Sequence, residues 1–147
     1  MATVDSIVDG LAAAVANVST VDQVSTDTFT PAISTQSIAA MIVPFGQSAG
    51  GDVHFTLGGG TAEIVHSIPI EFWVKHVPGA EATTMQRARN VPQLAIAQLL
   101  ASDGTGYDLA PEGEFTVTTE STFIEIGGQA YLTVTLTVPC RDEVTSA

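Results

Sequence analysis

The chain has 147 residues, of which 45% are apolar and only 14% are charged, and its 16 acidic and 4 basic residues give a net charge of -12. This length indicates a single domain that buries a core without disulfides or metals. So few basic residues argue against a dedicated DNA- or RNA-binding protein, because such binding depends on neutralising phosphates with Lys and Arg. The acidic surface either keeps the protein soluble or lines a passage that DNA crosses without sticking.

Cys140 is the single cysteine, which excludes a disulfide framework and a cysteine-rich metal site. The first ten residues, "MATVDSIVDG", lack the basic region of a secretory signal. No apolar run approaches the roughly 20 residues that cross a bilayer as a helix. We therefore expect a soluble protein that is made in a cytoplasm and has no membrane partner.

The first half of the chain predicts one helix and three strands. Apolar residues at helical spacing predict an amphipathic helix over residues 4–18. A Ser/Thr-rich segment over residues 19–37 predicts a loop with, at most, a short strand. The apolar run that follows predicts a strand covered on both faces over residues 38–45. Alternation on either side of Gly58–Gly60 predicts a hairpin of strands 52–57 and 61–76.

A second helix is predicted over residues 82–102, and Pro92 should either kink it or split it in two. The C-terminal third predicts a β-hairpin over residues 115–138 that turns at Gly127–Gly128. This turn places Phe123 opposite Leu132 and Val117 opposite Val138, which gathers the large apolar side chains on one face. The predicted fold is therefore α+β, a single domain in which a mainly antiparallel sheet packs with two helices, one at each end.

No catalytic or cofactor site is predicted. The glycine clusters lack the lysine of a phosphate-binding loop and are explained by turns. His54, His66 and His76 are spread over three places without a compact ligand motif, so we expect ordinary strand histidines rather than a metal site. Cys140 could pair with a histidine as a nucleophile, but a small buried residue is the preferred interpretation.

Two groups of carboxylates lack the pattern of a binding or catalytic site. The loop "SDGTGYDLAPEGE" holds Asp103, Asp108, Glu112 and Glu114, but Thr105 and Tyr107 stand at the alternate positions where a calcium loop has its ligands. A solvated acidic loop explains it better. A pair of Glu63 with Glu71 has no cleft marked around it.

The strand over residues 61–76 contains the most unusual stretch, "IPIEFWVKHVPGA". Its even positions are apolar and predict the core, whereas Glu71, Trp73 and Lys75 fall on the face expected to meet water. Three of the basic residues, Lys75, Arg87 and Arg89, lie close together in an otherwise acidic sequence. We therefore predict a subunit contact through Glu71, Trp73, Lys75, Arg87 and Arg89, against the alternative that the charges form local pairs. Under this hypothesis Trp73→Ala should block assembly and leave the monomer folded.

The order of elements resembles the tail terminator and neck proteins of long-tailed bacteriophages. The stretches that carry the resemblance are "SIPIEFWVKHV", "ATTMQRARNVPQLAIAQLLASDG" and the hairpin "FTVTTESTFIEIGGQAYLTVTLTVP", together with the first helix. They cover most of the chain and match by architecture rather than by a sharp motif. The loop over residues 19–37 departs from the pattern.

The resemblance implies a non-enzymatic virion protein in the tail or neck, a homo-oligomeric ring that is usually a hexamer. Such a ring caps the tail tube, contacts neighbouring neck and major tail proteins, and passes DNA through its channel. The hairpin between residues 50 and 61 would be an arm toward a neighbour. The alternatives within this class are a tail-completion or tail-tube protein. From other classes, a small ligand- or protein-binding domain ranks next and an enzyme ranks third.

Overall fold

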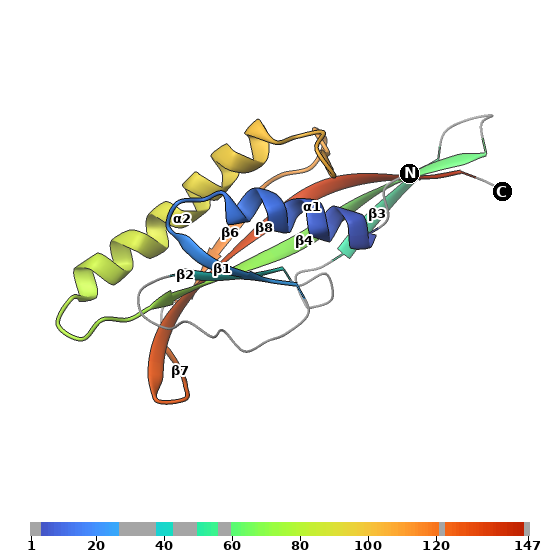
Figure 1. Ribbon diagram of the computed structural model, residues 1–147. Coiled ribbons are helices and arrows are strands. Elements are labelled where there is room, and N and C mark those ends of the chain that lie inside the picture. Colours follow the sequence, from blue (N-terminus) through green and yellow to red (C-terminus); the bar gives the residue numbers. More distant parts are fainter. Residues whose placement is uncertain (1–3, 27–37, 43–49, 56–59, 121–122, 146–147) are drawn as a thin grey trace.

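The computed structural model describes residues 4–26, 38–42, 50–55, 60–120 and 123–145. In this part of the chain, two helices lie on one side of an eight-stranded, mainly antiparallel sheet (Figure 1). The fold is α+β, as predicted. The elements are α1 (Val4–Ala16), β1 (Val21–Ser25), β2 (Ile38–Ile42), β3 (Gly50–Phe55), β4 (Thr61–Lys75), α2 (Glu81–Ala101), β5 (Asp108–Leu109), β6 (Thr116–Thr119), β7 (Ile124–Ile126) and β8 (Gln129–Thr145).

Two long strands, β4 and β8, form the centre of the sheet. They pair along their whole shared length, from Thr61 opposite Thr145 to Lys75 opposite Tyr131. The other edge of β4 pairs with β3 and then with β2, and β1 pairs with β2 in parallel. The other edge of β8 pairs in turn with β7, β6 and β5. The sheet therefore extends along one antiparallel ribbon, with short strands on both of its edges.

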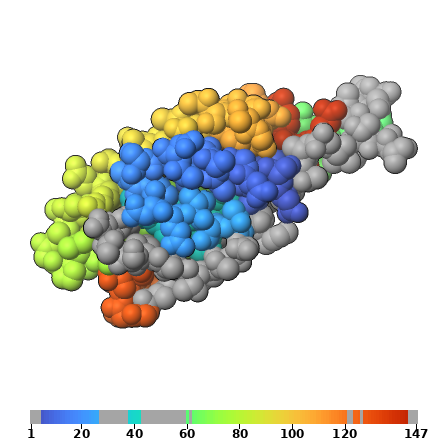
Figure 2. All heavy atoms as spheres, viewed as in Figure 1, coloured from blue at the N-terminus to red at the C-terminus, as the bar shows by residue number. Residues whose placement is uncertain are grey.

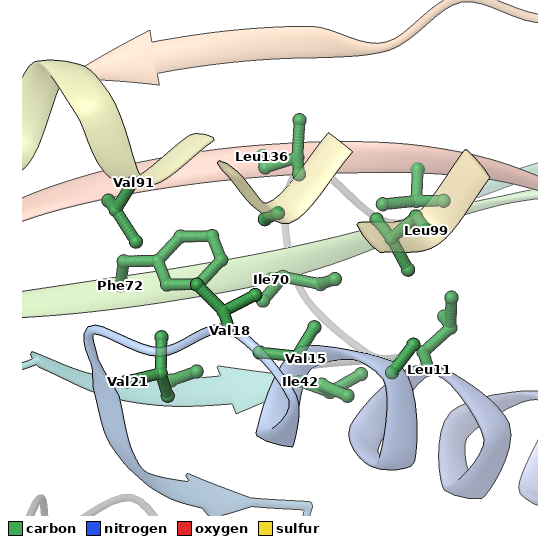
Figure 3. Packing of buried hydrophobic residues seen from close by; sticks show 14 of the residues in the cluster. Leu11, Val15, Val18, Val21, Ile42, Ile70, Phe72, Val91, Leu99 and Leu136 are labelled. Carbon is green, nitrogen blue, oxygen red and sulfur yellow. The ribbon is translucent and has the colours of Figure 1, made fainter. Parts of the chain in front are cut away.

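The core lies between the helices and one face of this sheet. Strand residues alternate between faces, and the even-numbered positions of β4 and β8, such as Phe72 and Leu136, point toward the helices. Figure 3 shows Leu11 and Val15 of α1 and Val91 and Leu99 of α2 packed with them. These side chains are almost completely buried. Burying each large apolar side chain contributes roughly 1.5–3 kcal/mol, so this layer is the main source of stability.

The predicted elements are present with small changes in length. The strand predicted over residues 38–45 is β2, which is buried at every position, and residues 43–45 lie outside the described residues. The hairpin predicted from residues 52–57 and 61–76 is the antiparallel pair of β3 and β4. The segment over residues 19–37 holds the short strand β1, and its residues 27–37 lie outside the described residues.

Helix α2 continues through Pro92 as one element, which excludes the second of the two predicted alternatives, a kink or a split. The ring of Pro92 is buried against the core, where its apolar surface offsets the hydrogen bond that a proline lacks. The helix ends beside Tyr107, whose hydroxyl donates a 2.6 Å hydrogen bond to the Leu99 carbonyl. Burial raises the pKa of Tyr107 to about 12, so this hydroxyl keeps its proton and serves as a structural donor.

Two features of the sheet correct the sequence prediction. Both helices pack on the same face, through one continuous core, rather than at opposite ends of the sheet (Figure 1). The register of the last hairpin is as predicted beside the turn, where Ile124 lies opposite Tyr131. Farther along, Val117 lies opposite Leu136 instead of Val138. The segment between β6 and β7 therefore holds two more residues than the facing part of β8.

The predicted core face of that hairpin is buried on β8 only. Leu132, Val134 and Leu136 are buried, whereas Val117 and Phe123 are 47% and 42% exposed. Helix α2 packs over β4 and β8 and does not cover β6, which lies at the margin of the sheet. The apolar side chains of β6 therefore have no helix above them. Apolar side chains at this margin remain accessible.

Candidate subunit-contact surfaces

Glu71, Trp73 and Lys75 lie on the face of the sheet that points away from the helices, as their odd positions in β4 predict. The register brings Ala39 and Met41 of β2 beside Trp73 and Glu71 on this face. The four buried residues Ala39, Met41, Trp73 and Tyr131 form a second, smaller apolar cluster there. The face is therefore partly a second core and not simply a solvent face.

Trp73 is the centre of this second cluster. Its side chain is only 3% exposed and meets the ring of Tyr131 edge-on, at a centroid distance of 5.8 Å and an interplanar angle of 76°. This edge-to-face geometry is favoured between aromatic rings. The role of Trp73 in a subunit contact stays a prediction, but within one chain its side chain is already enclosed.

The carboxyl group of Glu71 is half-buried beside Trp73. Burial raises the pKa of Glu71 above its ordinary value of 4.5, and the neighbouring polar indole group of Trp73 acts in the opposite direction. Removing a carboxylate from water disfavours its charged form. Glu71 and Trp73 are therefore coupled on this face, and the charge of Glu71 opposes folding at neutral pH.

The structure separates the five predicted contact residues into two groups. Lys75 shares the second face with Trp73, whereas Arg87 and Arg89 belong to α2, which covers the opposite face. The chain reverses direction between β4 and α2, so residues that are close in sequence end on different sides of the sheet. Lys75 and Arg87 are half-buried, and each interacts with other residues of the chain. The predicted basic region is therefore not one continuous surface.

Arg141, the remaining basic residue, was not among the predicted site residues. Its Nε lies 3.3 Å from Glu63 and its Nη2 lies 3.0 Å from Glu112. The pKa of Glu112 is lowered first by a hydrogen bond from its own backbone amide and further by Glu63 and Arg141. Only the pairing of β4 with β8 brings Glu63 close to Arg141, so no local sequence signal could reveal this cluster.

Arg89 is the one exposed basic residue among the described positions outside this cluster. The exposed acidic residues of the same positions are Asp5, Asp9, Asp22, Glu81, Asp103, Asp108, Glu112, Glu114, Glu120, Glu125 and Glu143. None of the ion pairs found within the described residues includes Arg89. Outside the Arg141 cluster, Arg89 is therefore the one fully exposed basic residue of the described positions, whose other exposed charged residues are acidic.

Most of the exposed large apolar side chains of the described residues lie in two regions, α2 and the segment of β6 and β7. Met85, Leu94 and Leu100 lie on α2 and are 45%, 44% and 58% exposed. Val117, Phe123 and Ile124 lie on or beside β6 and β7. The ring of Phe123 leans on His76 at a centroid distance of 4.6 Å. Singly exposed apolar residues are common, but grouped ones indicate contact surfaces.

Cys140 and His66 face each other across β4 and β8, and His66 Nε2 lies 3.8 Å from Asp142. The three residue types are those of a nucleophilic site. The Cys140 thiol is completely buried, however, and burial, with Asp103 and Asp108, raises its pKa to about 12. A catalytic cysteine needs a low pKa and access to a substrate. Cys140 is a core residue, as predicted.

Two more of the residues considered as site candidates have structural partners. His76 Nε2 lies 4.0 Å from Glu81, and Asp103 accepts a 2.8 Å hydrogen bond from the Leu109 amide. The side chain of His54 lies outside the described residues. Among the described residues, no group of three His, Cys, Asp or Glu side chains is arranged to hold a metal ion.

No known family model matches the sequence, and no curated protein is significantly similar to it. Within the described residues, neither helix combines the length and the apolar character that crossing a membrane would need.

Proposed function

We propose that this protein is a ring-forming structural subunit of a virus particle, a tail terminator that caps the tail tube and joins it to the head. The proposal combines the architectural resemblance of the sequence with the shape and charge of the folded chain. The alternatives in the same class are a tail-completion protein and a tail-tube protein. Each is a non-enzymatic subunit that acts by contacting copies of itself and neighbouring virion proteins.

The observation that carries the proposal is that the sheet extends beyond its helical cover at both ends (Figure 1). The main core reaches Ile68 on β4 and Cys140 on β8, whereas these strands continue to Thr61 and Thr145, with β3 alongside. At the other end, β7 and the start of β8 form a β-hairpin that projects from the sheet. Narrow β-ribbons are marginally stable in water unless they pack against something. Projections at both ends fit a subunit with a neighbour on each side.

The distribution of charge supports a role around DNA without a role in binding it. Nearly all exposed charges of the described residues are negative, and Arg141 is occupied by Glu63 and Glu112. A ring lined by such a surface repels the phosphates of DNA that moves through it. The same distribution disfavours a nucleic-acid-binding module as the alternative.

A small binding domain that holds a ligand between the sheet and the helices is the candidate from another class. The residues that would line such a cleft are packed against each other in Figure 3. Phe72, Val91, Leu99 and Leu136 are at most 1% exposed there. These side chains fill the space between the sheet and the helices. We therefore favour the ring-forming subunit over a ligand-binding domain.

Negative-stain electron microscopy of the purified protein tests the proposal. We expect rings with an open centre that remain single layers. Rings that stack into long tubes would instead favour the tail-tube alternative. Particles that stay single subunits at the highest concentration reached would contradict the proposed function.

A further inference from the structure

We propose that the outer face of α2 binds the hairpin tip of a second copy of this chain, in a head-to-tail contact. The outer face of α2 is the exposed side of residues 82–101, where Met85, Arg89 and Leu100 lie within about 60° of one another around the helix axis. The hairpin tip is the turn at Gly127–Gly128 with the exposed Phe123, Ile124 and Glu125. The contact rests on the proposed ring, in which each subunit has a neighbour on either side. It identifies the two surfaces that meet between neighbouring subunits.

The outer face of α2 has the composition of an interface rather than of a solvent face. Between Ala82 and Ala101 its exposed side chains are neutral except for Arg89, in a chain whose net charge is -12. The exposed side of α1, by comparison, carries Asp5 and Asp9. The centres of protein interfaces are poor in Lys, Glu and Asp and rich in Met and Arg. Over its 21 residues, α2 offers this surface along about 31 Å.

The hairpin tip offers the complementary surface. Phe123 and Ile124 are 42% and 39% exposed, and the exposed Glu125 follows them on the face of β7 opposite to Ile124. The tip therefore combines apolar side chains with negative charge, whereas the outer face of α2 combines apolar side chains with Arg89, an exposed basic residue that none of the ion pairs among the described residues includes. Opposite charges at the rim of an apolar contact fix its register and favour the correct partner.

The position of the two surfaces makes the second copy necessary. In Figure 1 the hairpin tip projects from the lower edge of the molecule, whereas α2 runs from the left side to the top, and Figure 2 shows most of α2 separated from the tip by other parts of the chain. The surfaces therefore meet between chains and not within one chain. A contact between two different patches repeats from copy to copy and closes into a ring when the rotation allows it.

A charge exchange tests the contact. Sedimentation velocity is measured for the full chain with Arg89→Glu, for the chain with Glu125→Lys, and for their equal mixture. Each substitution alone places like charges together and is expected to weaken association about tenfold at about 0.02 M salt, with a smaller effect at about 0.5 M. In the mixture the exchanged charges are again opposite, so association should recover to near the wild-type level.

A matched control separates this contact from the effect of net charge. Asp9→Lys changes the net charge as Glu125→Lys does, at an exposed acidic residue of α1. Because both substitutions reduce the repulsion between copies, weaker association in Glu125→Lys alone can come only from a local contact. Circular dichroism checks that each variant is folded.

Three results would overturn the contact. The first is a wild-type chain that stays monomeric at low salt. The second is a mixture that associates no better than the single variants. The third is an Asp9→Lys variant whose self-association is weakened as much as that of Glu125→Lys. Rings that persist in every variant would reject this contact and leave the proposed function in place. Recovery in the mixture without rings in the microscope would support the contact and reject the ring.

Discussion

The indole of Trp73 is held within its own chain by Tyr131 and by the neighbouring strand β2. Truncating a buried aromatic side chain leaves a cavity and typically costs about 3–5 kcal/mol. We therefore expect Trp73→Ala to lower the free energy of unfolding by about 3 kcal/mol or more, measured by urea denaturation. The expectation drawn from the sequence is that the monomer stays folded, and the structure adds that it should be less stable than the wild type.

Trp73→Phe is the control for this prediction, because it keeps an aromatic ring beside Tyr131. It should lose clearly less stability than Trp73→Ala. If Trp73→Ala unfolded at the same urea concentration as the wild type, the second apolar cluster would not contribute to folding. Any loss of assembly in that variant would then be a direct effect on the contact between subunits.

The ionisation of Glu71 should make the free energy of unfolding depend on pH. Replacing Glu71 by glutamine should remove this dependence. Its pKa in the folded chain is raised above 4.5 by burial, so its favourable contribution is fully present below that value and is lost as pH rises through the folded pKa. Glu71→Gln should therefore stabilise the protein at neutral pH, by less than about 1 kcal/mol because the group is only half-buried. The difference should vanish below pH 4.5.

The measurement is urea unfolding of wild type and variant at both pH values. Glu114→Gln, which changes an exposed carboxyl group, is the matched control and should alter stability by less than about 0.5 kcal/mol. An equal gain for Glu71→Gln at both pH values would show that the effect comes from something other than the ionisation of Glu71.

At the scale of the elements, α1 contacts the loop after α2 through two glycines. A Cβ atom on Gly10 would lie 2.9 Å from the carbonyl carbon and oxygen of Gly106, which is too close for backbone atoms that cannot move aside. Gly106 itself has a φ of 85°, a conformation that suits glycine. The contact requires a glycine inside the helix, although glycine is a poor helix former.

Gly10→Ala is therefore expected to destabilise the protein by about 1–3 kcal/mol through overpacking. Helix propensity alone predicts the opposite, a gain of about 1 kcal/mol. Thermal unfolding followed by circular dichroism distinguishes the two. Ala13→Gly, at an exposed position of α1, is the control and should cost about 1 kcal/mol. A more stable Gly10→Ala variant would mean that α1 does not approach Gly106 closely.

The last hairpin illustrates how far an element can be predicted from the sequence. The Gly127–Gly128 turn determines the pairing beside it, where the prediction is correct. Between β7 and β6 the register changes by two residues, and a change by two keeps every side chain on its face. The buried face of β8 was therefore predictable. The exposure of Val117 was not, because it depends on how far α2 reaches across the sheet.

At the scale of the whole molecule, the surfaces depend on pairings between distant parts of the chain. Lys75 and Arg87 are close in sequence, yet β4 and α2 place them on opposite sides of the sheet. Arg141 is far in sequence from Glu63 and Glu112, yet it binds both. Local patterns predict helices, strands and core faces, whereas the position of Arg89 as the exposed positive charge follows only from the complete fold.

Native mass spectrometry of the purified protein shows whether copies of this chain close into a ring. We expect one closed oligomer with a fixed number of copies, six if the architectural resemblance holds, and little of any other size. That number should not change as the protein is concentrated, because a closed ring has no free ends. A monomer at every concentration, or a continuous series of sizes that grows with concentration, would contradict the account.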